Sequence, residues 1–463
     1  MAVARRPHFV NHIRQYSASH VQDGACNRTK MGKGAKGYCM HRVGGLAGIV
    51  LLVGTAGAAQ AQPLSSYFPQ GVPGFDAMPG VTVLSRTRPD YEAQGIHVGD
   101  FLVAPSIQEG IGYDSNVLGG PGSPGSWTLG TSPSLSVTSD WSGDALAGVL
   151  GVDDTRYLDT PQQSRTNADL VVGGTKLVGR DQLTMAFAYM YLHEDRTALD
   201  AVPSDTPVTF TLADARIGYS VVLDRLSLTP NVEVSGYRYD NTTIMGVPAS
   251  QSYRDRDILA GGVTARYEIM PLQNALVVIR GTATNYLEQQ TGQPTRNSTG
   301  ALVLVGLSDD SDAVWRYRLL FGWEERNFAA SAYSTHAAPV AEAEVIWSPS
   351  GMTTVTGQLT RSIEDAAQEG VSGYTYTATK LTLDHEYRRD ILLQATGGVQ
   401  RADYLQGGGE QTALLFGLGA TWLVDQQMRV SATYSYDDQQ GGGTGTAGPF
   451  GRSLGLLTMR YGW

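Results

Sequence analysis

Cysteine is almost absent from this sequence. The 463 residues include only two, Cys26 and Cys39, and both precede a predicted signal-peptide cleavage site after Ala61. The processed chain would therefore carry no thiol. This excludes disulfides, zinc fingers, iron–sulfur sites and cysteine catalysis.

Long apolar runs are also missing after the N-terminus. Hydrophobic residues make up 41% of the chain, and no uninterrupted apolar stretch approaches the roughly 20 residues that a membrane-spanning helix needs. The 56 glycines and 23 tyrosines suit tight turns, crowded strand faces and interfacial aromatics instead. The composition therefore argues against a helical membrane protein and favours a β-rich one.

Basic residues are scarce in most of the chain. The formal net charge is −10, from 34 basic and 44 acidic residues. Residues 1–61 hold 8 of the basic residues and 1 of the acidic ones, so the remainder holds 26 and 43, a net charge of about −17. Only two lysines, Lys176 and Lys380, lie in that remainder. This charge argues against a nucleic-acid-binding protein.

The N-terminal region reads as a secretory signal. A short basic start at His41 and Arg42 precedes an apolar core over residues 43–57, and the small residues at 59–61 form a cleavage site. We therefore expect the mature protein to begin at Gln62.

Three regions follow from this reading. Residues 1–61 are an N-terminal extension and signal peptide, whose true start we place at Met40, with a long n-region as the alternative. Residues 62–100 are rich in proline and glycine without a clear period, and we predict a periplasmic lead-in segment. Residues 101–463 are predicted to form a β-barrel in the outer membrane of a Gram-negative bacterium.

The last strand is the clearest evidence for a barrel. Between Leu454 and Trp463, the odd positions from Leu457 onward are apolar or aromatic, and Thr458, Arg460 and Gly462 lie at even ones. Such alternation is typical of a transmembrane β-strand. This strand must pair with the first one, which begins near Phe101, because an open edge cannot survive in hydrocarbon.

Eighteen segments read as strands, with sixteen as the alternative count. They start near Phe101, Trp127, Ala145, Arg165, Gln182, Val208, Leu226, Asp255, Ala275, Arg296, Val314, Ala337, Met352, Tyr374, Leu392, Gln411, Met428 and Leu454. Their connections alternate between tight turns, such as residues 179–181, and longer loops, such as residues 193–207. This alternation indicates an up-and-down antiparallel transmembrane barrel with short periplasmic turns. A soluble sandwich or propeller has no reason to place all long loops on one side.

The two faces of the predicted strands differ in polarity. In the segment from Val314, Trp315 and Phe321 share one face with other apolar residues, while Arg316 and Arg318 lie on the other. Burying a midplane Arg or Lys in lipid costs roughly 2 to 4 kcal/mol, so we assign the charged face to the lumen. The candidate lumen-lining residues are Arg266, Glu268, Arg280, Arg316, Arg318, Glu342, Glu344, Lys380, Asp384, Glu386 and Arg460. They could pair with each other and stiffen the wall, or contact a passing solute, and the sequence leaves both roles open.

Outward aromatics near the short turns would form a periplasmic girdle. These are Tyr267, Trp315, Trp347, Tyr387, Trp422 and Trp463.

No catalytic set is evident. The histidines after residue 61 are scattered, at His97, His193, His336 and His385. Acidic pairs such as residues 153–154, 309–310 and 437–438 are interpreted as turn residues rather than calcium ligands. We therefore expect no enzyme activity, cofactor or metal site.

Three short motifs around the first strand carry a family resemblance. They are Arg-x-Arg-Pro-Asp-Tyr at residues 86–91, Gly-Ile-x-x-Gly-x-Phe at 95–101 and Tyr-Asp-x-Asn-Val at 113–117. This combination resembles the putative β-barrel porin 2 family of outer-membrane proteins, whose members often accompany exopolysaccharide loci. The resemblance is sharp over about residues 81–118 and rests on barrel patterning beyond them.

The resemblance implies a passive outer-membrane conduit involved in exopolysaccharide export. The expected partners are outer-membrane lipid, the barrel-assembly machinery, a periplasmic polysaccharide-export protein and the polysaccharide itself, and no nucleic acid. A general or solute-specific diffusion porin is the alternative function. An enzyme or a structural adhesin on the same scaffold is the third.

Overall fold

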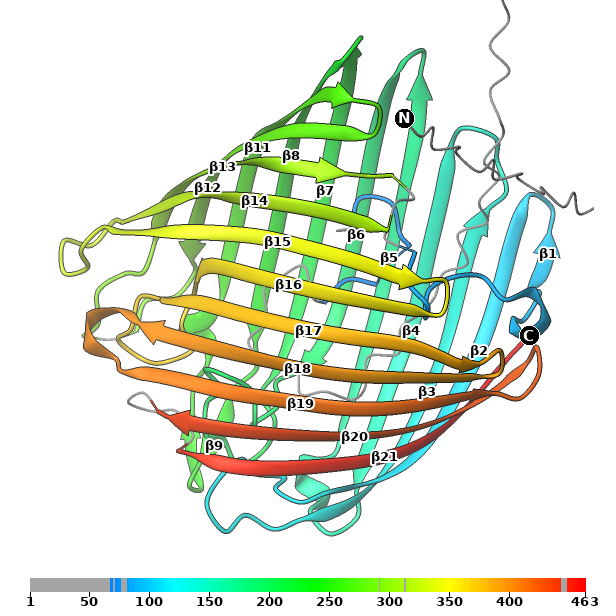
Figure 1. Cartoon of the computed structure of the whole chain (residues 1–463). Coiled ribbons are helices and arrows are strands. Elements are labelled where there is room, and N and C mark those ends of the chain that lie inside the picture. The colour runs from blue at the N-terminus through cyan, green and yellow to red at the C-terminus, as the bar shows by residue number, and fades with distance from the viewer. Residues whose placement is uncertain (1–66, 70, 76–80, 291, 312–313, 443–447) are drawn as a thin grey trace, which may run out of the picture. The chain divides into compact units, whose positions relative to one another are not determined.

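The computed structural model describes residues 67–69, 71–75, 81–290, 292–311, 314–442 and 448–463 (Figure 1). The predicted signal segment and the rest of residues 1–61 lie outside the described residues. Among the residues that are described, no helix is long and apolar enough to cross a membrane.

The described chain consists almost entirely of long antiparallel strands. Eighteen of them build the barrel: β2(Phe101–Asp114), β3(Ser126–Ser139), β4(Ala145–Tyr157), β5(Arg165–Val178), β6(Asp181–His193), β7(Thr209–Leu223), β8(Leu226–Tyr239), β11(Arg256–Met270), β12(Gln273–Tyr286), β13(Ser298–Asp309), β14(Trp315–Phe328), β15(His336–Ser350), β16(Thr353–Glu364), β17(Tyr374–Arg388), β18(Ile391–Tyr404), β19(Glu410–Leu423), β20(Met428–Gly441) and β21(Phe450–Gly462). The short elements are β1(Ile96–Val98), the hairpin β9(Thr242–Ile244) and β10(Val247–Ala249), and the 3-10 turns η2(Pro89–Tyr91), η3(Pro161–Gln163), η4(Ser252–Arg254) and η5(Leu405–Gly407).

The barrel is closed by pairing of its first and last strands. β21 lies antiparallel to β2, with Leu454 opposite Asp114 and Gly462 opposite Ser106. The terminal residue continues the ladder, because the Trp463 N–H donates to the Pro105 carbonyl at 3.1 Å. These pairings confirm the predicted closed, eighteen-stranded antiparallel β-barrel.

Each strand separates an apolar outer face from a mixed inner face, as the strand period of two requires. On β14, Trp315 and Phe321 are 53% and 49% exposed on the outside, whereas Leu320 is fully buried on the inside. Trp315 stacks on Trp347 of the neighbouring strand, with ring centroids 5.4 Å apart. These two aromatic residues lie next to a short turn, where an interfacial girdle is expected.

The barrel has a short-turn end and a loop end. Connections at the short-turn end are tight, and Asp224 and Leu272 adopt positive φ angles of 56° and 67° to make them. The loop end carries the longer connections, including residues 194–208 between β6 and β7 and residues 365–373 between β16 and β17.

The last two strands extend further than expected. The sequence predicted that residues 437–438 are turn residues and that the last strand begins near Leu454, but β20 runs to Gly441 and β21 begins at Phe450. Asp437 is paired with Arg452 across these strands. Residues 437–438 are therefore strand residues rather than turn residues. The alternation of apolar residues fades here, but backbone pairing continues beyond it.

Candidate functional site

The N-terminal lead-in contacts the inside of the barrel at two places. In the first, residues 67–69 and 71–75, which we call the inner segment, lie against the inner face of β4 to β8. Phe68, Val72 and Phe75 are buried there with the following wall residues: Val149, Val171, Ala186, Ala188, Met190, Phe210, Leu212 and Tyr237. The inner segment therefore occupies part of the lumen.

Two aromatic rings of the inner segment pack against one arginine. The rings of Phe68 and Phe75 are stacked with centroids 4.3 Å apart, and the Arg216 guanidinium lies 4.5 and 4.8 Å from their centres. Arg216 is held on the wall by Asp214 at 2.8 Å and Glu233 at 3.2 Å. We call this patch of wall, centred on Arg216, the aromatic seat.

The second contact is at the short-turn end. Arg86 and Arg88 both pair with Glu386 of β17, the latter at 2.9 Å. The Val83 N–H donates to Thr354 Oγ1 at 3.1 Å, and Val83 packs with Leu392 and other buried residues. The sequence predicted a lead-in to the barrel, and the structure shows that this part of it contacts the inner wall.

At the loop end, residues 194–208 cross the lumen. Counted from β2, β6 is the fifth barrel strand and β17 the fourteenth, so half of the barrel separates them. Leu199 from this loop is nevertheless packed with Tyr374 of β17. The Asp200 N–H also donates to Gln411 Oε1 of β19 at 3.0 Å.

Buried ion pairs fasten this crossing loop. Arg452 lies 2.7 Å from Asp114 and 3.7 Å from Asp195, and Arg165 lies 3.3 Å from Asp195. Burial alone would raise the pKa of Asp195, but the two arginines and hydrogen bonds from Thr197 outweigh it and lower the pKa to about 2. The Asp195 carboxylate therefore stays ionised and keeps the loop attached to β5 and β21.

Residues 365–373 form the other half of this closure. Asp365 pairs with Arg326 at 2.9 Å and with Arg256 at 3.0 Å. The Ala367 N–H donates to Asp200 Oδ2 at 2.7 Å, which joins the two loops. We call residues 194–208 and 365–373 the loop layer.

Asp200 is the titratable link within the loop layer. Burial raises the pKa of Asp200 to about 7, and the nearby charge of Glu194 acts in the same direction. The hydrogen bond from the Ala367 N–H, the Arg254 charge and the hydrogen bond with Tyr404 lower the pKa, but their effect is smaller. Near neutral pH the two loops are therefore joined by a carboxyl group that is close to losing its proton.

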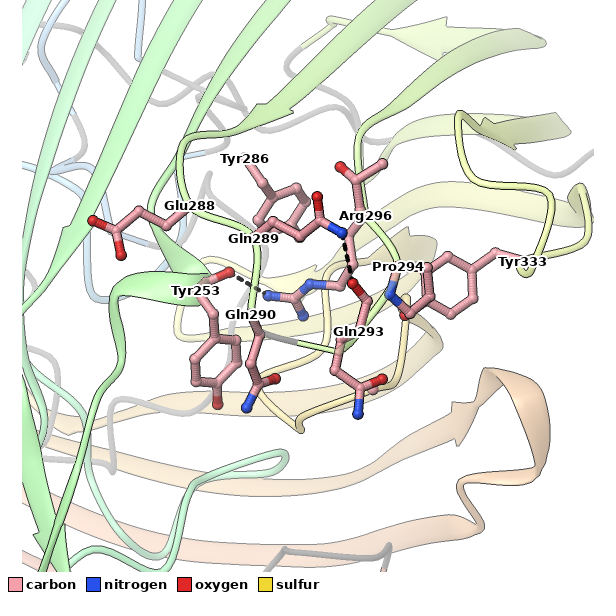
Figure 2. A pocket seen from close by; sticks show the side chains of 11 residues that line it. Tyr253, Tyr286, Glu288, Gln289, Gln290, Gln293, Pro294, Arg296 and Tyr333 are labelled. Atoms are coloured by element: carbon pink, nitrogen blue, oxygen red, sulfur yellow. Dashed lines mark hydrogen bonds between the residues drawn. The ribbon is translucent and has the colours of Figure 1, made fainter.

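A small pocket lies beside the loop layer. Figure 2 shows the Arg296 side chain among Tyr253, Tyr286 and several glutamines, and the guanidinium donates to the Tyr253 carbonyl at 2.8 Å. It also lies 4.4 Å from the centre of the Tyr286 ring. The pocket holds about 20 Å³, which is room for about one water molecule. It is too small to be a passage.

A larger cavity lies along the inner face of β2 to β5 and β18 to β21. It holds about 170 Å³. Tyr157 and Arg165 line it near the loop end, and Leu84 and Leu392 line it near the short-turn end. Between them the lining is mostly small and uncharged: Gln108, Gly110, Thr128, Gly130, Ser132, Asp153, Thr155, Gln394, Gly419, Thr421, Ser431, Thr433, Leu454, Leu456 and Thr458. We call it the polar track. Among the described residues, it reaches from one end of the barrel wall to the other.

The structure distributes the sequence-derived lumen candidates around the wall, and none of them lines the polar track. Some have partners elsewhere: Arg266 lies 3.4 Å from Asp310, and Asp384 accepts from Gln394 Nε2 at 2.9 Å. Further contacts join Arg316 to the Val81 carbonyl, Arg460 to Ser106, Glu344 to Gln358 and Glu386 to Arg86 and Arg88. Arg318 shares the inner face of β14 with Arg316, Arg280 and Glu268 lie on β12 and β11, and Lys380 and Glu342 are exposed.

Sequence reasoning overlooked the residues that do line the track or fasten the loops. Asp153 lies within β4 rather than in a turn, because β4 continues to pair with β5 as far as Thr155. Arg452 has the same strand parity as Arg460, so the alternation of the last strand could have revealed it. Gly, Ser and Thr on inner faces carry no comparable signal, since they also suit turns. Within the described chain, no three His, Cys, Asp or Glu side chains are grouped to hold a metal ion.

Comparison with known proteins shows the family of this chain. The sequence matches the family described as putative beta-barrel porin 2 over residues 88–446. No curated protein matches it. Among solved structures, it is similar to the outer membrane protein OpdK from Pseudomonas aeruginosa, with 11% identity, 78% of this chain and 99% of that chain covered and a TM-score of 0.42. It is also similar to the FrpB iron transporter from Neisseria meningitidis, with 8% identity, 78% and 81% covered and a TM-score of 0.38.

Proposed function

The chain belongs to the putative beta-barrel porin 2 family, and from this we propose that it is a conduit in the outer membrane of a Gram-negative bacterium that exports exopolysaccharide. The short-turn end would face the periplasm and the loop layer would face the outside. The expected partners are lipid, the barrel-assembly machinery and a periplasmic polysaccharide-export protein.

The observation that carries this proposal is the lining of the polar track. Hydroxyl and amide groups such as Thr421, Ser431 and Gln394 can exchange hydrogen bonds with sugar hydroxyls. A passage must bind its cargo weakly at many places for the cargo to leave again. A row of small uncharged side chains meets that requirement better than a cluster of charges.

The alternative function is a diffusion porin for small solutes, and the same track supports it. The two functions differ in the direction and size of the cargo. Loss of the gene should lower extracellular polysaccharide without slowing uptake of small solutes if the protein is an exporter. Unchanged secretion together with slowed uptake would select the porin.

A pair of substitutions tests whether the polar track is the path. Gly130 lies on the inner face of β3, and a Cβ there would have only the Asp154 carbonyl near it, at 4.0 Å. Gly130→Phe should therefore fill the track without disturbing the wall, and should reduce secretion and single-channel conductance. Leu129 is the neighbouring residue on the lipid-facing side, so Leu129→Phe is the matched control. Equal conductance of the two variants would show that the cargo does not use this track.

A further inference from the structure

Two glycines, one on the wall and one on the inner segment, allow the inner segment to lie close against the wall. Gly173 lies on the inner face of β5, and a Cβ added there would be 1.9 Å from the Pro73 carbonyl oxygen. A Cβ on Gly74, whose φ is +89°, would lie 2.6 Å from Ala186 Cβ. Gly173 is not among the residues with positive φ, so the β5 backbone itself would accept a side chain. The need for glycine at this position comes from the inner segment.

The wall residues of the aromatic seat can keep their arrangement when the inner segment leaves. Arg216 is bound by two carboxylates of the wall, Asp214 and Glu233, so its charge stays compensated with or without the two phenyl rings. The inner segment contributes one short turn, closed by the Phe75 N–H and the Val72 carbonyl at 3.1 Å. It forms no strand and does not join the ladder of the barrel. Its removal would therefore leave the wall pairing intact.

The inner segment is also well placed to restrict passage. It lies in one buried cluster with Val171 and Ala188, near the middle of β5 and β6, and the polar track is lined in part by residues of β4 and β5 nearer the loop end. A barrel of eighteen strands ordinarily encloses an aqueous channel wider than the polar track. Beneath the loop layer, the inner segment therefore fills space that an empty barrel would leave to water.

We propose that the inner segment is a tethered plug that closes part of the conduit while it occupies the aromatic seat, and that it leaves the seat during transport. The proposal rests on the conduit function proposed above. The stacked phenyl rings over a paired arginine give the seat its selectivity for this segment, since cation–π contacts favour aromatic faces.

A substitution that adds one methyl group to the wall, and so displaces the inner segment from the aromatic seat, tests the plug. Gly173→Ala should displace Pro73 and its neighbours from the seat, and should raise single-channel conductance in a planar bilayer by roughly two-fold or more, because more of the eighteen-stranded lumen opens to water. Deletion of residues 67–75 should give the same rise, and combining the two changes should add nothing. Gly218→Ala on β7 is the matched control, because it also adds an inward methyl group but meets only wall atoms, the nearest being the Pro230 carbonyl oxygen at 3.7 Å.

A synthetic peptide supplies the reverse experiment. Added on the side of the short turns to the protein that lacks residues 67–75, a peptide of sequence 67–75 should restore the wild-type conductance. The same peptide with alanine at Phe68 and Phe75 should not. Restoration by both peptides would contradict a seat that recognises aromatic rings.

Occupancy of the seat can be followed separately from conductance. With Cys26 and Cys39 replaced by serine, Pro69→Cys provides a single thiol on the inner segment, and its reaction with a maleimide should accelerate when Gly173→Ala is added. Equal labelling rates, or equal conductance of wild type and the deletion, would overturn the plug and leave the conduit standing. A barrel that conducts no ions with or without residues 67–75 would instead reject the conduit, and the plug with it.

Discussion

Replacement of Arg452 should release the loop that crosses the lumen without unfolding the barrel. The Arg452 side chain is 3% exposed and ties together β2, β21 and residues 194–208: it lies 2.7 Å from Asp114 and 3.7 Å from Asp195, and it donates to Thr197 Oγ1. Arg452→Met keeps most of the side-chain volume but leaves both carboxylates buried without their shared cation.

The magnitude follows from that loss. Removing one partner of a buried ion pair typically costs about 3–5 kcal/mol. Arg165 still lies 3.3 Å from Asp195, so we expect a value near the lower limit. At about 1.4 kcal/mol for each factor of ten, the fraction of molecules with a detached loop should rise roughly a hundredfold. The backbone ladder of the barrel does not depend on this side chain.

Hydrogen exchange measures this effect directly. Amides within residues 194–208 should lose protection in Arg452→Met, whereas amides of the β5 and β6 ladder should keep theirs. The double variant Arg452→Met with Asp114→Asn should regain part of the protection, because one of the unpaired charges is gone. Unchanged protection of residues 194–208 in the single variant would refute the assignment of Arg452 as the anchor.

Three further predictions follow. Phe321→Arg puts a charge on the lipid face near the middle of β14 and should weaken insertion by roughly 2 to 4 kcal/mol, measured as the yield of folded, heat-modifiable protein. Glu342→Arg is the control, because Glu342 lies on the inner face at the same level. Equal yields of the two variants would contradict the face assignment. The raised pKa of Asp200 means that the contribution of this one carboxyl group to loop packing is fully present below about pH 4 and is lost as the pH rises through about 7. Asp200→Asn should abolish that change in hydrogen-exchange protection, and a variant that keeps the wild-type pH profile would assign the change to another group. Deletion of residues 461–463 removes part of the pairing with β2 and should leave a protease-sensitive chain; normal amounts of folded barrel would show that closure does not need these residues.

The wall of the barrel could be predicted from sequence because its signal is local. A strand alternates every two residues, and lipid on one side and water on the other impose opposite polarity on the two faces. Trp315 and Arg316 therefore reveal their sides without knowledge of any partner. The requirement that no edge remain open then pairs the last strand with the first.

The contents of the barrel were decided only by the tertiary structure. Gly173 reads as an ordinary strand glycine until the Pro73 carbonyl, a hundred residues earlier, is found against it. Arg452 meets Asp114 across 338 residues of chain, and Leu199 is buried in one cluster with Tyr374, whose strand lies half of the barrel away from β6. These contacts depend on which loops and which part of the lead-in lie inside the barrel. The alternation of residues along a strand does not encode which segments lie there.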